Sequence, residues 1–256
     1  MLALAAFAVA DTAAGLKAFR NKDYATAYRE FKAAADQGNA EAEFNLGLMY
    51  ARGIGVQQDI EEAMRLFQLS ASQGNARAQW RLGVRYSQGW GVQQNMAEAS
   101  RWYQMAADQG DEHGQMGIAE MYEQGAGVQQ DFKTAVFYYQ QAAKQGLAPA
   151  QYDLGQMTEK GKGLKRDTEA AFELYKKAAE QGFAPAQEKL GAMYASGTGV
   201  KADPEQAYFW SSLAAKQREK AAQKRLEFLS TKMSPDAVSR AQKSAGEWKP
   251  VLSASR

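Results

Sequence analysis

The stretch Gly-Val-Gln-Gln-Asp at residues 55–59 (GVQQD) returns as GVQQN at 91–95 and again as GVQQD at 127–131. Both steps, from 55 to 91 and from 91 to 127, are 36 residues long. The same step relates five glycines, which are Gly53, Gly89, Gly125, Gly161 and Gly197. Repetition at a fixed spacing of this size is typical of a stack of similar units. The sequence therefore predicts five full copies of one unit.

One copy, residues 39–74, predicts two helices joined by a tight bend. Ala42, Leu46 and Met49 follow helical spacing, and Gly53 can adopt the left-handed conformation that ends a helix. Asp59 then stands where its carboxylate can cap the first turn of a second helix. The GVQQD stretch is thus expected to be the bend between two antiparallel helices. Because so short a unit cannot bury a core alone, neighbouring copies must complete it.

The repeated pattern resembles that of the Sel1-like repeat family, relatives of the tetratricopeptide repeats. The second copy carries it in Leu82, Gly83, Tyr86, Gly89, Gly91, Val92, Ala99, Trp102, Tyr103, Ala106, Ala107, Gln109 and Gly110. The resemblance implies an all-α fold, a right-handed α-solenoid of antiparallel helix pairs in which the first helix of each pair lines the concave side. It also implies an adaptor that binds other proteins.

The repeats divide the chain into segments with different expected roles. Residues 39–218 contain the five Sel1-like repeats, and residues 11–38 resemble a shorter tetratricopeptide-like unit that caps the amino-terminal end. Residues 219–256 leave the repeat register and are expected to form capping helices and a tail. Apolar residues of this last segment are expected to cover the open end of the final repeat: Leu226, Phe228, Leu229, Val238 and Trp248.

Composition excludes several classes of function. The formal net charge of +2 over 256 residues argues against nucleic-acid binding and against a polybasic membrane tether. Zero cysteines exclude disulfides, zinc–thiolate sites and thiol catalysis. With His113 as the single histidine, neither a metal site nor a catalytic triad can be assembled. We therefore predict a protein that is not an enzyme and has no cofactor.

The first ten residues are apolar and end in Ala8-Val9-Ala10, a small-residue pattern typical of a signal-peptide cleavage site. This predicts cleavage near Ala10 and a periplasmic or secreted bacterial protein. The alternative is an apolar turn that docks on the repeats. Ten apolar residues are too few to span a bilayer, so stable membrane insertion is not expected.

Comparison of the copies predicts the binding residues. On a helical wheel, the first helix of each unit has a second stripe opposite its packing face, and this stripe is polar and differs in every copy. Ordinary solvated surface would also vary in this way. The residues of the stripe that we predict to contact a partner are Asn45, Arg52, Arg81, Glu120, Asp153, Lys160 and Lys189.

Two further residues are predicted to bind a partner because they depart from the repeat. Arg85 stands where the other copies have methionine, so its guanidinium needs Glu120, a bound carboxylate or another structural ion pair. Trp90 lies between the two glycines of its bend, where a tryptophan is typical of an interface hot spot. The alternative for Trp90 is packing on a neighbouring loop.

These observations predict a non-enzymatic scaffold or adaptor that binds a partner protein or peptide in a concave groove. The alternative is an envelope glycan- or peptidoglycan-binding module that uses Tyr and Trp rings as stacking platforms.

Overall fold

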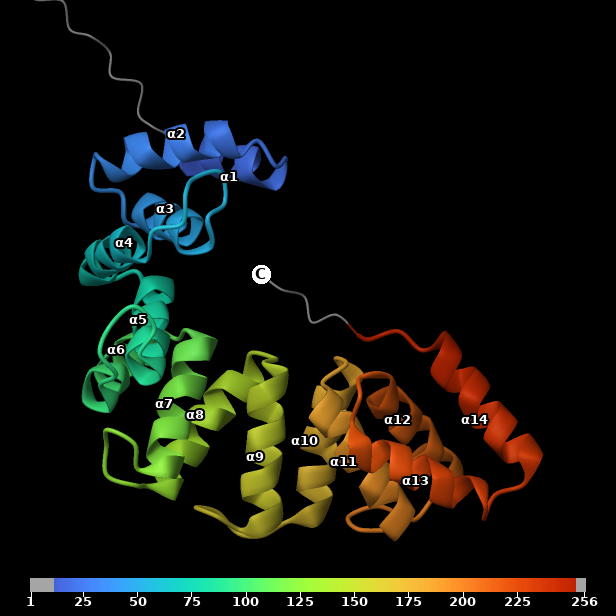
Figure 1. The fold of residues 1–256 in the computed structure, drawn as a ribbon. Helices are drawn as coiled ribbons and strands as arrows, with labels where there is room; N and C mark the ends of the chain where they lie inside the picture. The colour runs from blue at the N-terminus through green and yellow to red at the C-terminus, as the bar shows by residue number, and fades with distance from the viewer. Residues whose placement is uncertain (1–11, 252–256) are drawn as a thin grey trace, which may run out of the picture. The chain divides into compact units, whose positions relative to one another are not determined.

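The computed structural model describes residues 12–251, and the regular elements of that range are all α-helices. Consecutive helices pack against one another as pairs within each compact unit (Figure 1). The predicted all-α solenoid of antiparallel helix pairs is confirmed. The helices of the described range are α1 (Thr12–Arg20), α2 (Tyr24–Ala35), α3 (Ala40–Arg52), α4 (Ile60–Ser72), α5 (Ala76–Gln88), α6 (Met96–Asp108), α7 (Glu112–Gln124), α8 (Phe132–Lys144), α9 (Ala148–Lys160), α10 (Thr168–Glu180), α11 (Ala184–Ser196), α12 (Pro204–Lys216), α13 (Lys220–Ser230) and α14 (Pro235–Glu247).

The chain forms two compact units that divide between residues 129 and 130. Unit 1 contains α1 to α7, and unit 2 contains α8 to α14. In the five 36-residue repeats, the odd-numbered helices α3 to α11 come first and are called A helices below. The even-numbered helices α4 to α12 come second and are called B helices. The predicted signal segment, residues 1–10, lies outside the described residues.

Local capping explains where these helices begin and end. Each A helix ends at a glycine with a φ angle between 65° and 74°, a conformation that glycine adopts at little cost. Each B helix begins after a residue whose side-chain oxygen accepts a hydrogen bond from the first turn, as predicted for Asp59. The equivalent caps are Asn95, Asp131, Asp167 and Asp203.

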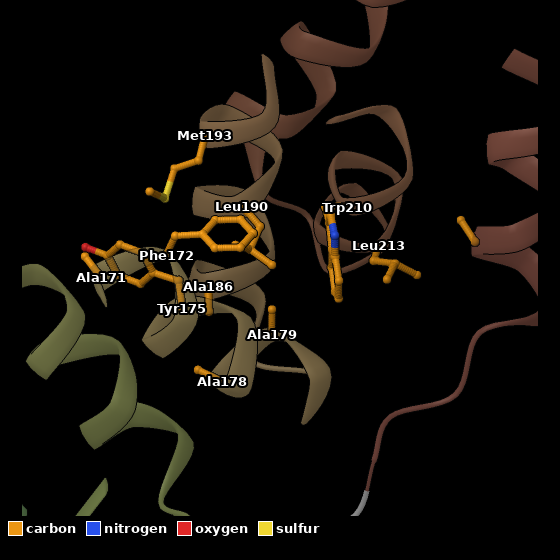
Figure 2. Close-up of a cluster of buried hydrophobic side chains, with 11 residues drawn as sticks. Ala171, Phe172, Tyr175, Ala178, Ala179, Ala186, Leu190, Met193, Trp210 and Leu213 are labelled. Atoms are coloured by element: carbon orange, nitrogen blue, oxygen red, sulfur yellow. The ribbon is translucent and has the colours of Figure 1, made fainter. Parts of the chain in front are cut away.

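Aromatic rings of the B helices pack directly on glycines of the A helices. A Cβ atom added at Gly47 would lie 2.8 Å from the Phe67 ring, and one at Gly155 would lie 2.8 Å from the Tyr175 ring. Both rings are almost completely buried. These positions therefore require glycine for the close approach. Figure 2 shows such a cluster in unit 2, where Tyr175 lies among side chains of α10, α11 and α12.

An additional helix pair flanks the repeat region at each end, α1 with α2 before it and α13 with α14 after it. In α1, a Cβ at Gly15 would lie 2.6 Å from the ring of Phe31 on α2, so this pair repeats the ring-on-glycine contact. At the other end, Leu229 is buried in a cluster with Leu226 and Val238. Trp248 packs against Trp210 with ring centroids 6.4 Å apart. The expectation that Phe228 also covers this end is wrong, because it is 62% exposed and is not part of that cluster.

Candidate functional site

The A helices combine a constant buried position with a variable neighbour. One position is apolar and buried in all five repeats, as Leu46, Leu82, Ile118, Leu154 and Leu190. The residue directly before it changes its chemistry in each repeat, from Asn45 to Arg81, Gly117, Asp153 and Lys189. The first position holds the repeats together, and the second is free to differ. We call the surface that carries the variable position the A-helix face.

Unit 1 gathers four arginines on this face, and we call them the arginine cluster: Arg52, Arg77, Arg81 and Arg85. Three of them are four residues apart along α5, which places them on one side of that helix. Arg52 is the last residue of α3. Burial lowers the pKa of Arg81, and the positive charges of the other three arginines lower it further. No acidic side chain of the described residues opposes this effect.

Arg77 is the member of the cluster that is ion-paired. Its Nη1 lies 3.1 Å from Oε1 of Glu41 on α3, and its guanidinium lies 4.4 Å from the centre of the Phe44 ring. Glu41 also accepts hydrogen bonds from the side chains of Asn45 and Asn75. The carboxylate of Glu41 is thus bound by groups of its own repeat and of the next one. No ion pair joins it to Arg52, Arg81 or Arg85 in the described part of the chain.

Arg81 is half-buried, and none of the ion pairs within residues 12–251 involves it. Its guanidinium carbon lies 4.3 Å from the centre of the Trp80 ring, and that ring lies 4.6 Å from the ring of His113 on α7. The Nε atom of Arg81 is buried and has no hydrogen-bond partner among the described residues. A buried donor without a partner is costly. Arg52 is exposed and likewise has no ion-pair partner in residues 12–251.

Arg85 is joined to the bend that carries Trp90. Its Nη1 donates a hydrogen bond of 3.4 Å to the backbone oxygen of Trp90, and burial lowers the pKa of the guanidinium. The expected ion pair between Arg85 and Glu120 is not present in the described part of the chain, because the side chain of Arg85 turns to the bend. The side chain of Trp90 is 57% exposed. This exposure is the condition for an interface anchor, and the contact role of Trp90 stays a prediction.

Asn45 does not lie where the helical wheel placed it. Its side chain is only 7% exposed, and its amide donates to the backbone oxygen and to Oε1 of Glu41. The predicted solvent-facing orientation is therefore wrong for Asn45, because the inter-repeat contacts of Glu41 enclose it. Gly117 takes the variable position in the third repeat and is also buried, against the ring of Tyr103. Glu120, four positions before the end of α7, is half-buried.

In unit 2, the A-helix face carries cations that have partners. Nζ of Lys189 lies 2.8 Å from Oε2 of Glu159, and the same oxygen accepts a hydrogen bond of 2.9 Å from the Tyr175 hydroxyl. Burial would raise the pKa of Glu159, but the hydrogen bonds from Lys189 and Tyr175 outweigh it and hold the pKa below its usual value. Burial and the neighbouring Glu159 raise the pKa of Tyr175.

Three predicted binding residues lie in unit 2, and the structure brings two of them together. Lys160 and Lys189 line an open hollow of about 400 Å³, together with Glu159 and Arg166. Nζ of Lys160 donates a hydrogen bond of 3.1 Å to Gln156. Asp153 is half-buried on α9, nearly two turns before Glu159 and Lys160 of that hollow. Their role in binding a partner remains a prediction.

Arg77 lies on the variable stripe of the sequence but is not among the residues predicted to contact a partner, and Trp80 is not predicted either. A signal for both is present in the stretch ARAQWRLGVR, where arginines recur every fourth residue around a tryptophan. A position-by-position comparison of repeats gives little weight to a feature that is confined to one helix. The consecutive residues Asp111, Glu112 and His113 could present donor atoms within 4.8 Å of one another. In the structure, however, Asp111 is the N-cap of α7 and His113 packs on Trp80.

The described helices include none that is long and apolar enough to cross a membrane. No curated protein matches the chain. A Sel1 repeat protein from Oxalobacter formigenes is similar in structure, with a TM-score of 0.81 and 30% identity over 94% of this chain and 98% of that one.

Two other solved structures are also similar. The protective antigen c5321 of uropathogenic Escherichia coli has a TM-score of 0.61 and 28% identity, over 91% of this chain and 59% of that one. The immunity protein Pa5087 of Pseudomonas aeruginosa, at 19% identity and a TM-score of 0.53 over 81% of this chain and 83% of that one, shares the fold. The Sel1 repeat model matches residues 40–75, 76–111, 113–147, 148–183 and 184–218. The chain belongs to the Sel1 repeat family.

Proposed function

We propose that the protein is a non-enzymatic scaffold that binds a partner protein or peptide along its A-helix face. Sel1 repeat proteins generally act as scaffolds for protein interactions, and their fold is typically not catalytic. The observation that carries the proposal for this chain is the paired position on the A helices. Leu82 and its equivalents remain apolar and buried, whereas the residue before differs in every repeat and is partly exposed at Arg81, Asp153 and Lys189. A surface that varies on a constant framework can fit one particular partner.

Trp90 supports the same proposal from a different part of the repeat. Tryptophan is enriched in binding hot spots, and an exposed ring beside a guanidinium offers both apolar area and a hydrogen-bond donor. Trp90 has this arrangement, because its own backbone oxygen holds Arg85 in place. The equivalent residue of the fifth repeat is Thr198, which is exposed and has no ring. Thr198 is therefore a matched control for Trp90.

Site-specific photocrosslinking in the native cell tests this function. A photoreactive amino acid at position 90 is expected to attach to one defined protein, and the same amino acid at position 198 is not. Adding excess unlabelled wild-type protein should reduce the attachment. Equal attachment of many proteins from both positions would contradict a specific binding surface.

The glycan-binding alternative is not favoured by the described aromatic residues. A stacking platform needs several exposed rings on one surface, but the most exposed rings lie on three different elements. These are Trp90 in the bend after α5, Phe137 on α8 and Phe228 on α13. Other large aromatic residues of the repeats, such as Phe67 and Tyr175, are buried in the packing between helices.

An exported, periplasmic or secreted location is also part of the proposal. Its support is the apolar stretch that ends at Ala10. Expression of this chain in a bacterium, followed by fractionation and amino-terminal sequencing, is expected to give a processed protein outside the cytoplasm that begins near Asp11. An unprocessed protein found only in the cytoplasm would contradict this location.

A further inference from the structure

The arginine cluster of unit 1 has more positive charge than its surroundings neutralise. Glu41 is bound by Arg77, Asn45 and Asn75, and the other three guanidinium groups have no carboxylate partner in the part of the chain that the structure describes. The remaining groups belong to Arg52, Arg81 and Arg85, and Arg85 donates only to a backbone oxygen. Like charges held together on a partly buried surface repel each other, so the surface gains stability when an anion binds.

The equivalent position in unit 2 has a carboxylate partner that Arg81 does not have. Arg81 and Lys189 occupy the same repeat position, since 189 − 81 is three steps of 36 residues. Lys189 is neutralised by Glu159 from the preceding A helix, at 2.8 Å. The residue that corresponds to Glu159 in unit 1 is Ala51, because 159 − 51 is also three steps of 36. Arg81 therefore lacks the carboxylate that the same fold supplies elsewhere in the chain.

The surface around these arginines contains apolar as well as basic groups. Leu48 and Val84 are half-buried on the same faces of α3 and α5, and Trp90 is exposed beside Arg85. Guanidinium groups bind carboxylates through paired hydrogen bonds, and apolar neighbours favour a ligand that has side chains of both kinds. A nucleic acid would need an extended basic track, which a formal net charge of +2 does not favour.

We infer that the A-helix face of unit 1 binds an acidic peptide segment of the partner protein, with carboxylates on Arg52, Arg81 and Arg85 and an apolar side chain against Trp90. This inference rests on the proposed scaffold function and gives its partner a chemical class. The guanidinium of Arg81 is half-buried and has no carboxylate partner among the described residues, so a ligand carboxylate would supply its counter-charge. Arg81 is expected to be the most sensitive residue of the surface.

The experiment measures fluorescence anisotropy with a labelled peptide that contains consecutive glutamates and one leucine. A second peptide has glutamine in place of each glutamate, and a labelled single-stranded oligonucleotide is the third probe. The protein variants are Arg81→Gln, Arg52→Gln and the matched control Lys189→Gln. All three variants remove one positive charge, but Lys189→Gln removes it from the paired site in unit 2.

The glutamate peptide is expected to bind wild type and to bind the Arg81→Gln variant about tenfold more weakly, as for the loss of one charged hydrogen bond. Arg52→Gln should weaken it several-fold, and Lys189→Gln by less than about twofold, as for a distant exposed charge. The glutamine peptide should bind far more weakly than the glutamate peptide. Added salt should weaken binding of the glutamate peptide.

Other outcomes would overturn the inference. Equal loss in Arg81→Gln and Lys189→Gln would indicate attraction to net charge alone, and tighter binding of the oligonucleotide would indicate a nucleic-acid surface. Failure of the glutamate peptide to bind wild type would also overturn it. The scaffold proposal is tested separately by crosslinking from position 90, and a specific adduct there would stand even if the glutamate peptide does not bind.

Discussion

Arg81 in unit 1 and Lys189 in unit 2 hold the same repeat position but have different surroundings. Lys189 lies 2.8 Å from Glu159, whose carboxylate also binds the buried Tyr175 hydroxyl. Arg81 has a ring contact with Trp80 and a buried Nε without a partner among the described residues. In unit 2 the cation thus forms an ion pair between neighbouring helices, whereas in unit 1 the cation is available to bind a ligand. Glu159 and its counterpart Ala51 are the difference that decides whether a carboxylate meets the cation at this position.

Removing the carboxylate of Glu159 in unit 2 should have the largest effect, on the free energy of unfolding. In a Glu159→Ala variant, the Tyr175 hydroxyl and Lys189 both lose their partner, and we expect unfolding to require about 1–3 kcal/mol less free energy. Denaturant unfolding at pH 7 measures this. Because the pKa of Glu159 is lowered in the folded protein, its contribution is present above the pKa of an unfolded glutamate and disappears as the pH falls through the lowered value.

The same variant should also change binding. Without Glu159, Lys189 has no counter-charge and resembles Arg81. In a protein that already carries Arg81→Gln in unit 1, adding Glu159→Ala should therefore raise the affinity of unit 2 for the glutamate peptide several-fold. Glu159→Gln separates the two roles, since it also removes the charge that pairs with Lys189 but its amide oxygen can still accept a hydrogen bond from Tyr175. A Glu159→Ala variant as stable as wild type would show that the Lys189 pair does not hold the helices together.

Adding a carboxylate to unit 1 should have the opposite effect on binding. In an Ala51→Glu variant, the new side chain stands in the same relation to Arg81 as Glu159 does to Lys189. We expect it to occupy the guanidinium and to weaken the glutamate peptide about tenfold, by competition for one charged hydrogen bond. Anisotropy measures the affinity, and circular dichroism verifies the helices. Ala51→Gln is the control, and unchanged affinity in Ala51→Glu would break the comparison.

A second difference lies between the first repeat and later repeats, in a ladder of side-chain amides that the second repeat of unit 1 also has, as Gln109 donating to Gln79 at 2.6 Å. In unit 2, Gln181 donates to Gln151 at 2.8 Å and Gln217 donates to Gln187 at 2.9 Å. In each pair, the glutamine of the A helix also donates to a backbone oxygen eight residues before it. The first repeat of unit 1 has Glu43 instead, and its carboxylate accepts from Gln73 at 2.7 Å. Burial raises the pKa of Glu43, and the charge of Arg65 opposes this only in part.

Glu43→Gln should therefore stabilise unit 1 at neutral pH, by about 0.5–1 kcal/mol, the net contribution of one hydrogen bond. The new amide could donate to the backbone oxygen of Ala35, as its equivalents do. A raised pKa means that the folded state binds the proton more tightly, so the penalty of Glu43 grows as the pH rises through the raised value. Thermal unfolding from pH 4 to pH 8 should show no gain at the acid end and the full gain at pH 8. A gain that does not depend on pH would contradict this origin.

Most of the fold could be predicted from the sequence because its determinants are local and repeated. Gly53 ends a helix and Asp59 begins the next through contacts within a few residues, so the same residues in each copy produce the same bend. The repeat register also predicted which positions pack. Phe228 was misplaced because it follows the last repeat, where no second copy indicates which side of the helix faces the core.

The candidate site was harder to predict because its contacts join residues about 30 positions apart. The helical wheel placed Asn45 on the outer face of its own helix, but Arg77 and Asn75 from the next repeat bind Glu41 beside it. The wheel likewise showed Arg81 and Lys189 as equivalent, although only Lys189 meets a carboxylate. Such pairings depend on how adjacent A helices lie against each other, which the period alone does not specify.

The smallest effect is expected from Arg81→Gln on stability. An arginine without a counter-charge, repelled by three other arginines, contributes little to folding, so we expect the free energy of unfolding to stay within about 0.5 kcal/mol of wild type. The matched Lys189→Gln should lower it by more, because it leaves Glu159 half-buried without its ion pair. Denaturant unfolding of both variants gives the comparison directly. If Arg81→Gln proved the more destabilising of the two, Arg81 would be a structural residue, and its guanidinium would not be available to a ligand.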